Sequence, residues 1–98
     1  MISWSPRGKK RLLECMRHIA EQCQDWPTVI IWRDSVYKQV EHLEDFPLSG
    51  VMVREIGRKD IRQILLGDYR IIYRVKNNIP EIISIRHCRI LIRSMQEL

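Results

Sequence analysis

Hydrophobic residues recur every three or four positions in the first half of the chain and at shorter intervals in the second half. The first helical stripe consists of Leu12, Met16, Ile19 and Cys23. Ser5 and Pro6 precede it, and they form a typical helix start because serine caps helices and proline fits the first turn. These features predict an amphipathic helix over about residues 6–24.

A second helical stripe follows a break at residues 24–27. It consists of Val29, Trp32, Val36, Val40 and Leu43. Pro27 disfavours helical geometry at the preceding residue and can itself open a new helix. Residues 46–50 (FPLSG) end the stripe. Because the break is short, the two helices are expected to form an antiparallel hairpin.

The rest of the chain has the pattern of strands. Predicted strands cover residues 61–66 (IRQILL), 69–75 (YRIIYRV) and 81–88 (EIISIRHC), with turn signals between them. Extended structure is also expected at residues 1–4 (MISW) and 51–55 (VMVRE), and a frayed strand end or short helix at 89–98. The order β-α-α-β-β-β predicts an α+β fold. Its mainly antiparallel sheet would carry the helical hairpin on one face, in a single domain over residues 1–98.

Alternation of side chains along the strands predicts which residues share a face. The residues expected beneath the helices are Tyr69, Ile71, Tyr73, Val75, Ile83 and Ile85, and those expected on the opposite, open face are Arg70, Arg74, Ile82, Ser84, Arg86 and Cys88. For residues 61–66 the pattern leaves the inward face undecided. Like charges on paired strands repel, so Arg70, Arg74 and Arg86 predict an anionic partner or a local carboxylate such as Asp60, Asp68 or Glu81.

Composition and charge narrow the class of protein. With 98 residues and 45% hydrophobic content the chain can form one compact domain, and no apolar run approaches the roughly 20 residues needed to cross a membrane. The N-terminus lacks the apolar segment of a secretory signal, so an intracellular protein is expected. A formal charge of +5 favours acidic partners.

Three cysteines without a C-x-x-C pair argue against a disulfide framework or a zinc knuckle. Cys15 and Cys23 are expected to be core residues. Cys15 and His18 share a helix face, but two ligands alone do not make a metal site. No metal and no cofactor are therefore expected.

The stretches FPLSG, IRQILLGDYRIIYRV and EIISIRHCR, placed after two helices, resemble the RelE/ParE superfamily of type II toxins. The resemblance covers the chain from the first helix to about Arg89 and is closest to the ParE-like branch, although Arg86-His87-Cys88-Arg89 departs from the usual ending of that branch. It implies a cytoplasmic prokaryotic toxin of the plasmid-stabilization type. Such a toxin inhibits growth and is neutralised by an acidic antitoxin, as a homodimer or a toxin–antitoxin hetero-oligomer.

The resemblance implies two alternative activities, since RelE-like members cut mRNA on the ribosome without a metal and ParE-like members poison DNA gyrase. The nucleases match Arg70 with an arginine that contacts the scissile phosphate. They carry lysines where this chain has Ile61 and Gln63, and an arginine or histidine where it has Cys88. A neutral thiol is a poor substitute for either group. A shift of one position would bring in His87 or Arg89, so the catalytic candidates of the nuclease interpretation are Arg70, His87 and Arg89.

The incomplete set of nuclease groups favours a gyrase inhibitor that is not an enzyme. The alternatives are the ribosome-dependent endoribonuclease and a degenerate toxin that only binds its antitoxin. Candidate residues for binding a target or antitoxin are Arg70, Arg74, Arg86, Trp32 and Tyr37. Each also has a structural interpretation, because arginine stems cover apolar sheet surface and tryptophan commonly lies in a core. For His87, a hydrogen-bonded structural role competes with proton donation.

Overall fold

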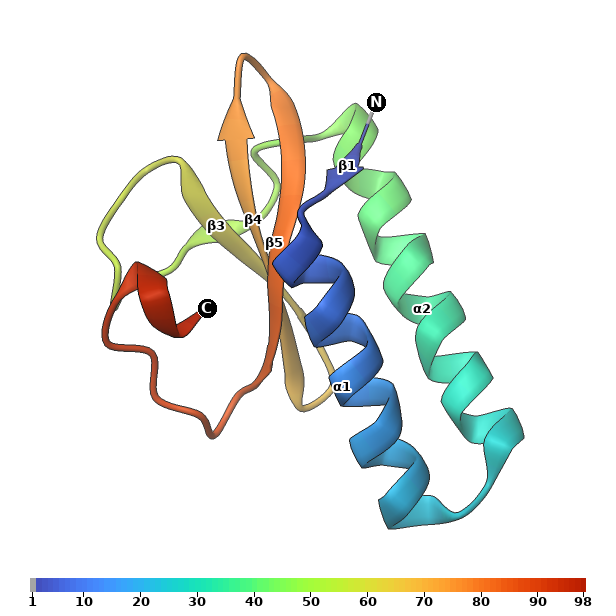
Figure 1. Cartoon of the computed structure of the whole chain (residues 1–98). Coiled ribbons are helices and arrows are strands. Elements are labelled where there is room, and N and C mark those ends of the chain that lie inside the picture. The colour runs from blue at the N-terminus through green and yellow to red at the C-terminus, as the bar shows by residue number, and fades with distance from the viewer. Residues whose placement is uncertain (1) are drawn as a thin grey trace.

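A computed structural model describes residues 2–98 and contains a helical hairpin packed on a five-stranded sheet (Figure 1). The elements in chain order are β1 (Ser3–Trp4), α1 (Pro6–Cys23), α2 (Trp26–Asp45), β2 (Val51–Met52), β3 (Ile61–Leu66), β4 (Tyr69–Lys76), β5 (Ile79–His87) and the 3-10 helix η1 (Met95–Glu97). The α+β class and the order of the elements are confirmed. Met1, which belongs to the predicted first strand, lies outside the described residues.

The strands lie in the order β1-β5-β4-β3-β2, with β1 parallel to β5 and all other pairs antiparallel. The extended segment predicted at residues 51–55 forms a strand only at Val51 and Met52, which make β2 at the edge of the sheet. The sheet therefore has one strand more than the four in the predicted order.

Local sequence explains where the helices begin and end. The Ser5 side chain accepts a hydrogen bond from the Gly8 N–H at 2.9 Å, and Pro6 occupies the first turn of α1. Gln24 ends α1 in the left-handed region, with φ 51°. Both helices lie on the same side of the sheet (Figure 1). Their buried faces pack with strand residues in the larger core, which consists of Leu12, Cys15, Val36, Val40, Leu43, Ile71, Tyr73, Ile82 and Ile85.

The face of the sheet opposite the helices is covered by the C-terminal segment, residues 88–98, so the expectation of an open face is wrong (Figure 1). A second core lies there and consists of Val53, Ile61, Ile72, Ile92 and Leu98, with Ile56, Ile83 and Met95 packed against it. The segment could bury this surface because it carries three apolar residues at intervals of three, Ile92, Met95 and Leu98. That spacing was the signal in the sequence for a packed segment.

A β-bulge in β5 explains a second wrong expectation. Ile72 pairs with Ser84 and Tyr73 pairs with Ile82, which leaves Ile83 as an extra residue between them. The bulge shifts the alternation by one position, so Ile82 lies in the helix-side core and Ile83 packs against the second core. Ile85, beyond the bulge, faces the helices as predicted.

Candidate functional site

Arg70 is enclosed on the face of the sheet covered by the C-terminal segment. Its side chain is 8% exposed and forms an ion pair with Glu55, with 2.9 Å between Nη1 and Oε2. It also donates to the Gln63 side-chain oxygen at 3.2 Å and to the Ile90 carbonyl at 3.0 Å. The predicted exposure of this arginine is therefore wrong, because three separate parts of the chain converge on its guanidinium.

Glu55 supplies the charge that permits this burial. A hydrogen bond from its own backbone N–H, followed by the hydrogen bond and charge of Arg70, holds the pKa of the Glu55 carboxyl below its usual value of 4.5. Truncating either member of such a pair leaves a desolvated charge without compensation. Nothing in the sequence marked Glu55, because it lies in an irregular segment 15 residues before Arg70.

Arg74 has a local carboxylate partner, as the strand pattern predicted. It lies directly opposite Glu81 on β5 and forms an ion pair with it at 2.8 Å. Asp60, another predicted partner, pairs instead with Arg58 at 2.7 Å, which lowers the pKa of the Asp60 carboxyl. Like-charge repulsion between the strands is thus offset within the chain at Arg74.

Arg86 is the exception among the three predicted arginines. It lies opposite Arg70 in the strand register, yet its side chain forms no hydrogen bond and no ion pair with any residue of the described range 2–98. Burial, and next the charge of Arg11, lower the pKa of its guanidinium. The three arginines therefore do not form one exposed surface: Arg70 is enclosed, Arg74 is paired, and Arg86 lies beside α1.

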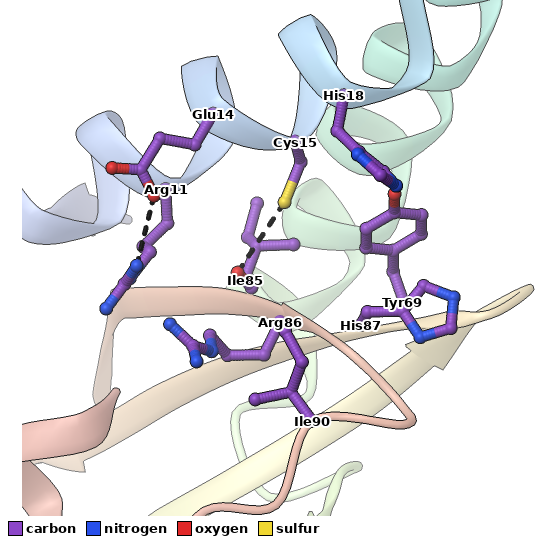
Figure 2. A pocket seen from close by; sticks show the side chains of 9 residues that line it. All are labelled: Arg11, Glu14, Cys15, His18, Tyr69, Ile85, Arg86, His87 and Ile90. Atoms are coloured by element: carbon purple, nitrogen blue, oxygen red, sulfur yellow. Dashed lines mark hydrogen bonds and ion pairs between the residues drawn. The ribbon is translucent and has the colours of Figure 1, made fainter. Parts of the chain in front are cut away.

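A pocket of about 200 Å³ lies between α1 and the end of β5, and is called here the α1–β5 pocket (Figure 2). It is lined by Arg11, Glu14, Cys15, His18, Tyr69, Ile85, Arg86, His87 and Ile90. Burial raises the pKa of the Cys15 thiol to about 11, and its sulfur lies 3.6 Å from the Ile85 carbonyl oxygen. Cys15 is therefore a neutral packing group at pH 7 rather than a nucleophile.

His87 and Arg89 do not join Arg70 in one solvent-facing catalytic group. The Nδ1 atom of His87 accepts a hydrogen bond from the Arg89 backbone N–H at 3.1 Å, and its ring contacts Tyr69 edge-on at 5.2 Å. Arg89 is exposed, whereas Arg70 is enclosed. This geometry supports the structural interpretation of His87. Cys88, where the nuclease relatives carry an arginine or histidine, is exposed.

The two aromatic candidates differ in exposure. Trp32 is half-buried and contacts Tyr69 edge-on at 5.1 Å, at the margin of the larger core. Tyr37 is 42% exposed, and its ring contacts Trp4 of β1 edge-on at 5.9 Å. Tyr37 is therefore the better placed of the two to contact another protein.

Two further findings apply to the described residues. No group of three histidine, cysteine or acidic side chains among them is arranged to hold a metal ion. None of the helices in that range has the length and apolar character required to span a membrane.

The helical hairpin on a mainly antiparallel sheet is the fold expected of a RelE/ParE-superfamily toxin, and the match to a family model shows that the chain is one. The family model described as the ParE toxin of the type II toxin-antitoxin system, parDE, matches residues 2–92, so the chain belongs to the ParE toxin family. Among curated proteins no match was found.

A solved structure shares the fold. It is a chain of the chromosomal ParDE TA system from P. aeruginosa, with a TM-score of 0.72 and 17% sequence identity, and the match covers 88% of the present chain and 92% of that one. At this level of identity the likeness establishes the common fold and carries no further conclusion about individual residues.

Proposed function

We propose that this ParE-family toxin arrests growth in the cytoplasm by acting on DNA gyrase through protein–protein contact, and that it is not a nuclease. The enclosure of Arg70 carries the proposal. Metal-free RNA cleavage needs a cation free to stabilise charge on the scissile phosphate. Here that guanidinium is 8% exposed and already bound by Glu55, Gln63 and the Ile90 carbonyl.

A cognate acidic antitoxin is proposed to neutralise the toxin. The formal charge of +5 favours such a partner. A groove of about 340 Å³ crosses the hairpin beside β1 and is lined by Trp4, Lys9, Leu12, Leu13 and Tyr37. Leu13 and Tyr37 are exposed apolar or aromatic groups there, and exposed apolar grooves beside lysine suit an amphipathic acidic segment.

The test measures supercoiling by purified gyrase at micromolar toxin, with primer extension on mRNA from induced cells in parallel. We expect inhibited supercoiling or trapped cleaved DNA, and intact transcripts. The variant Arg89→Ala removes an exposed nuclease candidate without disturbing packed groups, so it should leave growth arrest unchanged. Unaffected gyrase contradicts the proposal. Codon-linked mRNA cuts that are lost in the exposed-site variant Arg89→Ala would establish the nuclease, and normal growth on induction would indicate an antitoxin-binding module.

A further inference from the structure

The side chain of Arg86 is half-buried and forms no hydrogen bond or ion pair with any described residue, although the charges of Glu14 and Glu97 act on it and oppose the lowering of its pKa by burial. Its Nε atom is buried without a hydrogen-bond partner, as are the Nε atoms of Arg11 and Arg70, but Arg11, Arg70 and Arg74 each contact a carboxylate and Arg86 does not. Removing a charge from water is costly unless an opposite charge or hydrogen bonds replace the water. Within the described residues, Arg86 therefore lacks the direct carboxylate contact that the other three arginines have.

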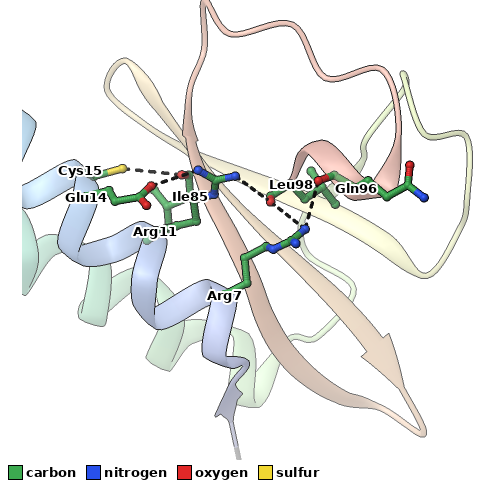
Figure 3. Close-up of polar contacts among 7 residues, drawn as sticks. All are labelled: Arg7, Arg11, Glu14, Cys15, Ile85, Gln96 and Leu98. Atoms are coloured by element: carbon green, nitrogen blue, oxygen red, sulfur yellow. Dashed lines mark hydrogen bonds and ion pairs between the residues drawn. The ribbon is translucent and has the colours of Figure 1, made fainter.

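The neighbouring arginine does not complete it. The guanidinium groups of Arg11 and Arg86 point toward the same end of the α1–β5 pocket (Figure 2). Arg11 is already bound by Glu14 at 3.0 Å and by the Leu98 oxygen at 3.1 Å, and Arg7 donates to the same Leu98 oxygen (Figure 3). Arg11 is thus fixed in place by α1 and the C-terminal segment, and its charge makes Arg86 more dependent on an added anion.

The dimensions and lining of the pocket select the kind of anion. A volume of about 200 Å³ is below the roughly 300 Å³ at which small-molecule sites begin, and it suits a single side chain. Tyr69, Ile85 and Ile90 provide apolar contacts for a short stem. The Glu14 carboxylate at the pocket disfavours a phosphate dianion more than a single carboxylate, which one guanidinium can bind through two parallel hydrogen bonds.

We propose that the α1–β5 pocket is a carboxylate-binding site in which Arg86 receives one acidic side chain of a polypeptide partner. The inference deepens the proposed function, since it rests on that function for the identity of the partner as the acidic antitoxin. Ile90, which lines the pocket, and its chain neighbour Leu91 are both exposed and would contact an apolar neighbour of the acidic residue.

The test titrates the toxin with N-acetyl-glutamyl-leucine amide and follows the backbone and arginine side-chain NMR signals. The matched neutral probe is N-acetyl-glutaminyl-leucine amide, and inorganic phosphate is a third probe. We expect millimolar binding of the glutamyl probe, with shifts at Arg86, Cys15 and His87, and at least tenfold weaker binding of the glutaminyl probe. Arg86→Gln should weaken glutamyl binding at least tenfold, while the exposed control Arg17→Gln should change it less than twofold.

Arg86→Gln removes an unpaired charge, so the variant should fold with unchanged or greater thermal stability, and this is checked by its melting curve. Absence of binding, equal binding of the two peptide probes, tighter binding of phosphate, or unchanged affinity in Arg86→Gln would each overturn the proposal. Growth arrest reports separately on the proposed function. If arrest is absent while the glutamyl probe binds through Arg86, the carboxylate site stands and the toxin activity does not.

Discussion

At the scale of single residues, the sheet shows that three arginines predicted to act together have three separate environments. Arg70 and Arg86 lie opposite one another, but Glu55 and the C-terminal segment enclose only Arg70. Arg74 lies opposite Glu81, which neutralises it. The environment of each guanidinium therefore depends on contacts with segments distant in the sequence, and strand alternation alone cannot supply them.

Replacing Glu55 with glutamine should destabilise the fold. The substitution keeps the shape of the side chain but leaves the Arg70 guanidinium without its counter-charge. Because the Glu55 side chain is 31% exposed, we expect a loss of about 1–2 kcal/mol in the free energy of unfolding at pH 7, below the cost of breaking a fully buried pair. Urea unfolding measures it, and Glu21→Gln on the exposed face of α1 is the matched control.

The effect of Glu55→Gln should depend on pH with a definite sign. The pKa of Glu55 is lowered in the folded protein, so its contribution to stability is present above the ordinary value of 4.5 and is lost as pH falls through the folded-state pKa. As pH falls from 4.5 through the folded-state pKa, the difference in the free energy of unfolding between wild type and variant should therefore become smaller. A difference that stays constant down to pH 2 would show that the ion pair with Arg70 does not stabilise the fold.

At the scale of elements, α1 and β5 approach one another closely where Gly8 faces the sheet. An added Cβ at Gly8 would lie 2.4 Å from the Ile82 carbonyl oxygen, which is backbone and cannot rotate away. Gly8→Ala should therefore force α1 away from β5 despite the better helix propensity of alanine, and should cost about 1–3 kcal/mol by thermal or urea unfolding. Lys10→Ala, on the exposed side of the same helix, should change stability by less than about 0.5 kcal/mol. Equal stability of the two variants would contradict this packing.

The helices and strands themselves were predictable from the sequence, whereas the way they pair and pack was only partly predictable. Capping by Ser5 and the proline at residue 27 located the starts of both helices within one residue, because these are local signals. The bulge at Ile83 was not predictable, since it depends on how β5 fits both β4 and the segment beside it. The partners of Arg70 were missed for the same reason: Gln63, Glu55 and Ile90 come from three segments brought together only by the complete fold.

At the scale of the whole molecule, the sheet separates two hydrophobic cores. The larger lies under the helical hairpin, and the smaller lies under the C-terminal segment. The same segment carries the Ile90 carbonyl that binds Arg70 and the Leu98 oxygen that binds Arg11. Packing of this segment therefore determines both the enclosure of Arg70 and the position of the arginine next to Arg86.

Two adjacent residues of the C-terminal segment provide a test of this arrangement. Ile92 is 1% exposed within the smaller core, whereas Leu91 is 61% exposed. Ile92→Ala should cost about 2–4 kcal/mol in the free energy of unfolding, because it removes buried methyl groups and leaves a cavity. Leu91→Ala removes a side chain of equal size from the surface and should cost less than about 0.5 kcal/mol.

Hydrogen exchange and NMR should show the same difference between the Ile92→Ala and Leu91→Ala variants. In Ile92→Ala the amides of residues 90–98 should exchange faster, and the Arg70 side-chain signals should broaden as the segment loosens, while the helices keep their protection. In Leu91→Ala neither change is expected. Equal costs for the two alanine variants, or unchanged Arg70 signals in Ile92→Ala, would mean that the segment does not pack on the sheet and that Arg70 is held by Glu55 and Gln63 alone. In that case the guanidinium would be accessible from the face opposite the helices, and Arg70 would be free to contact a phosphate as a nuclease requires.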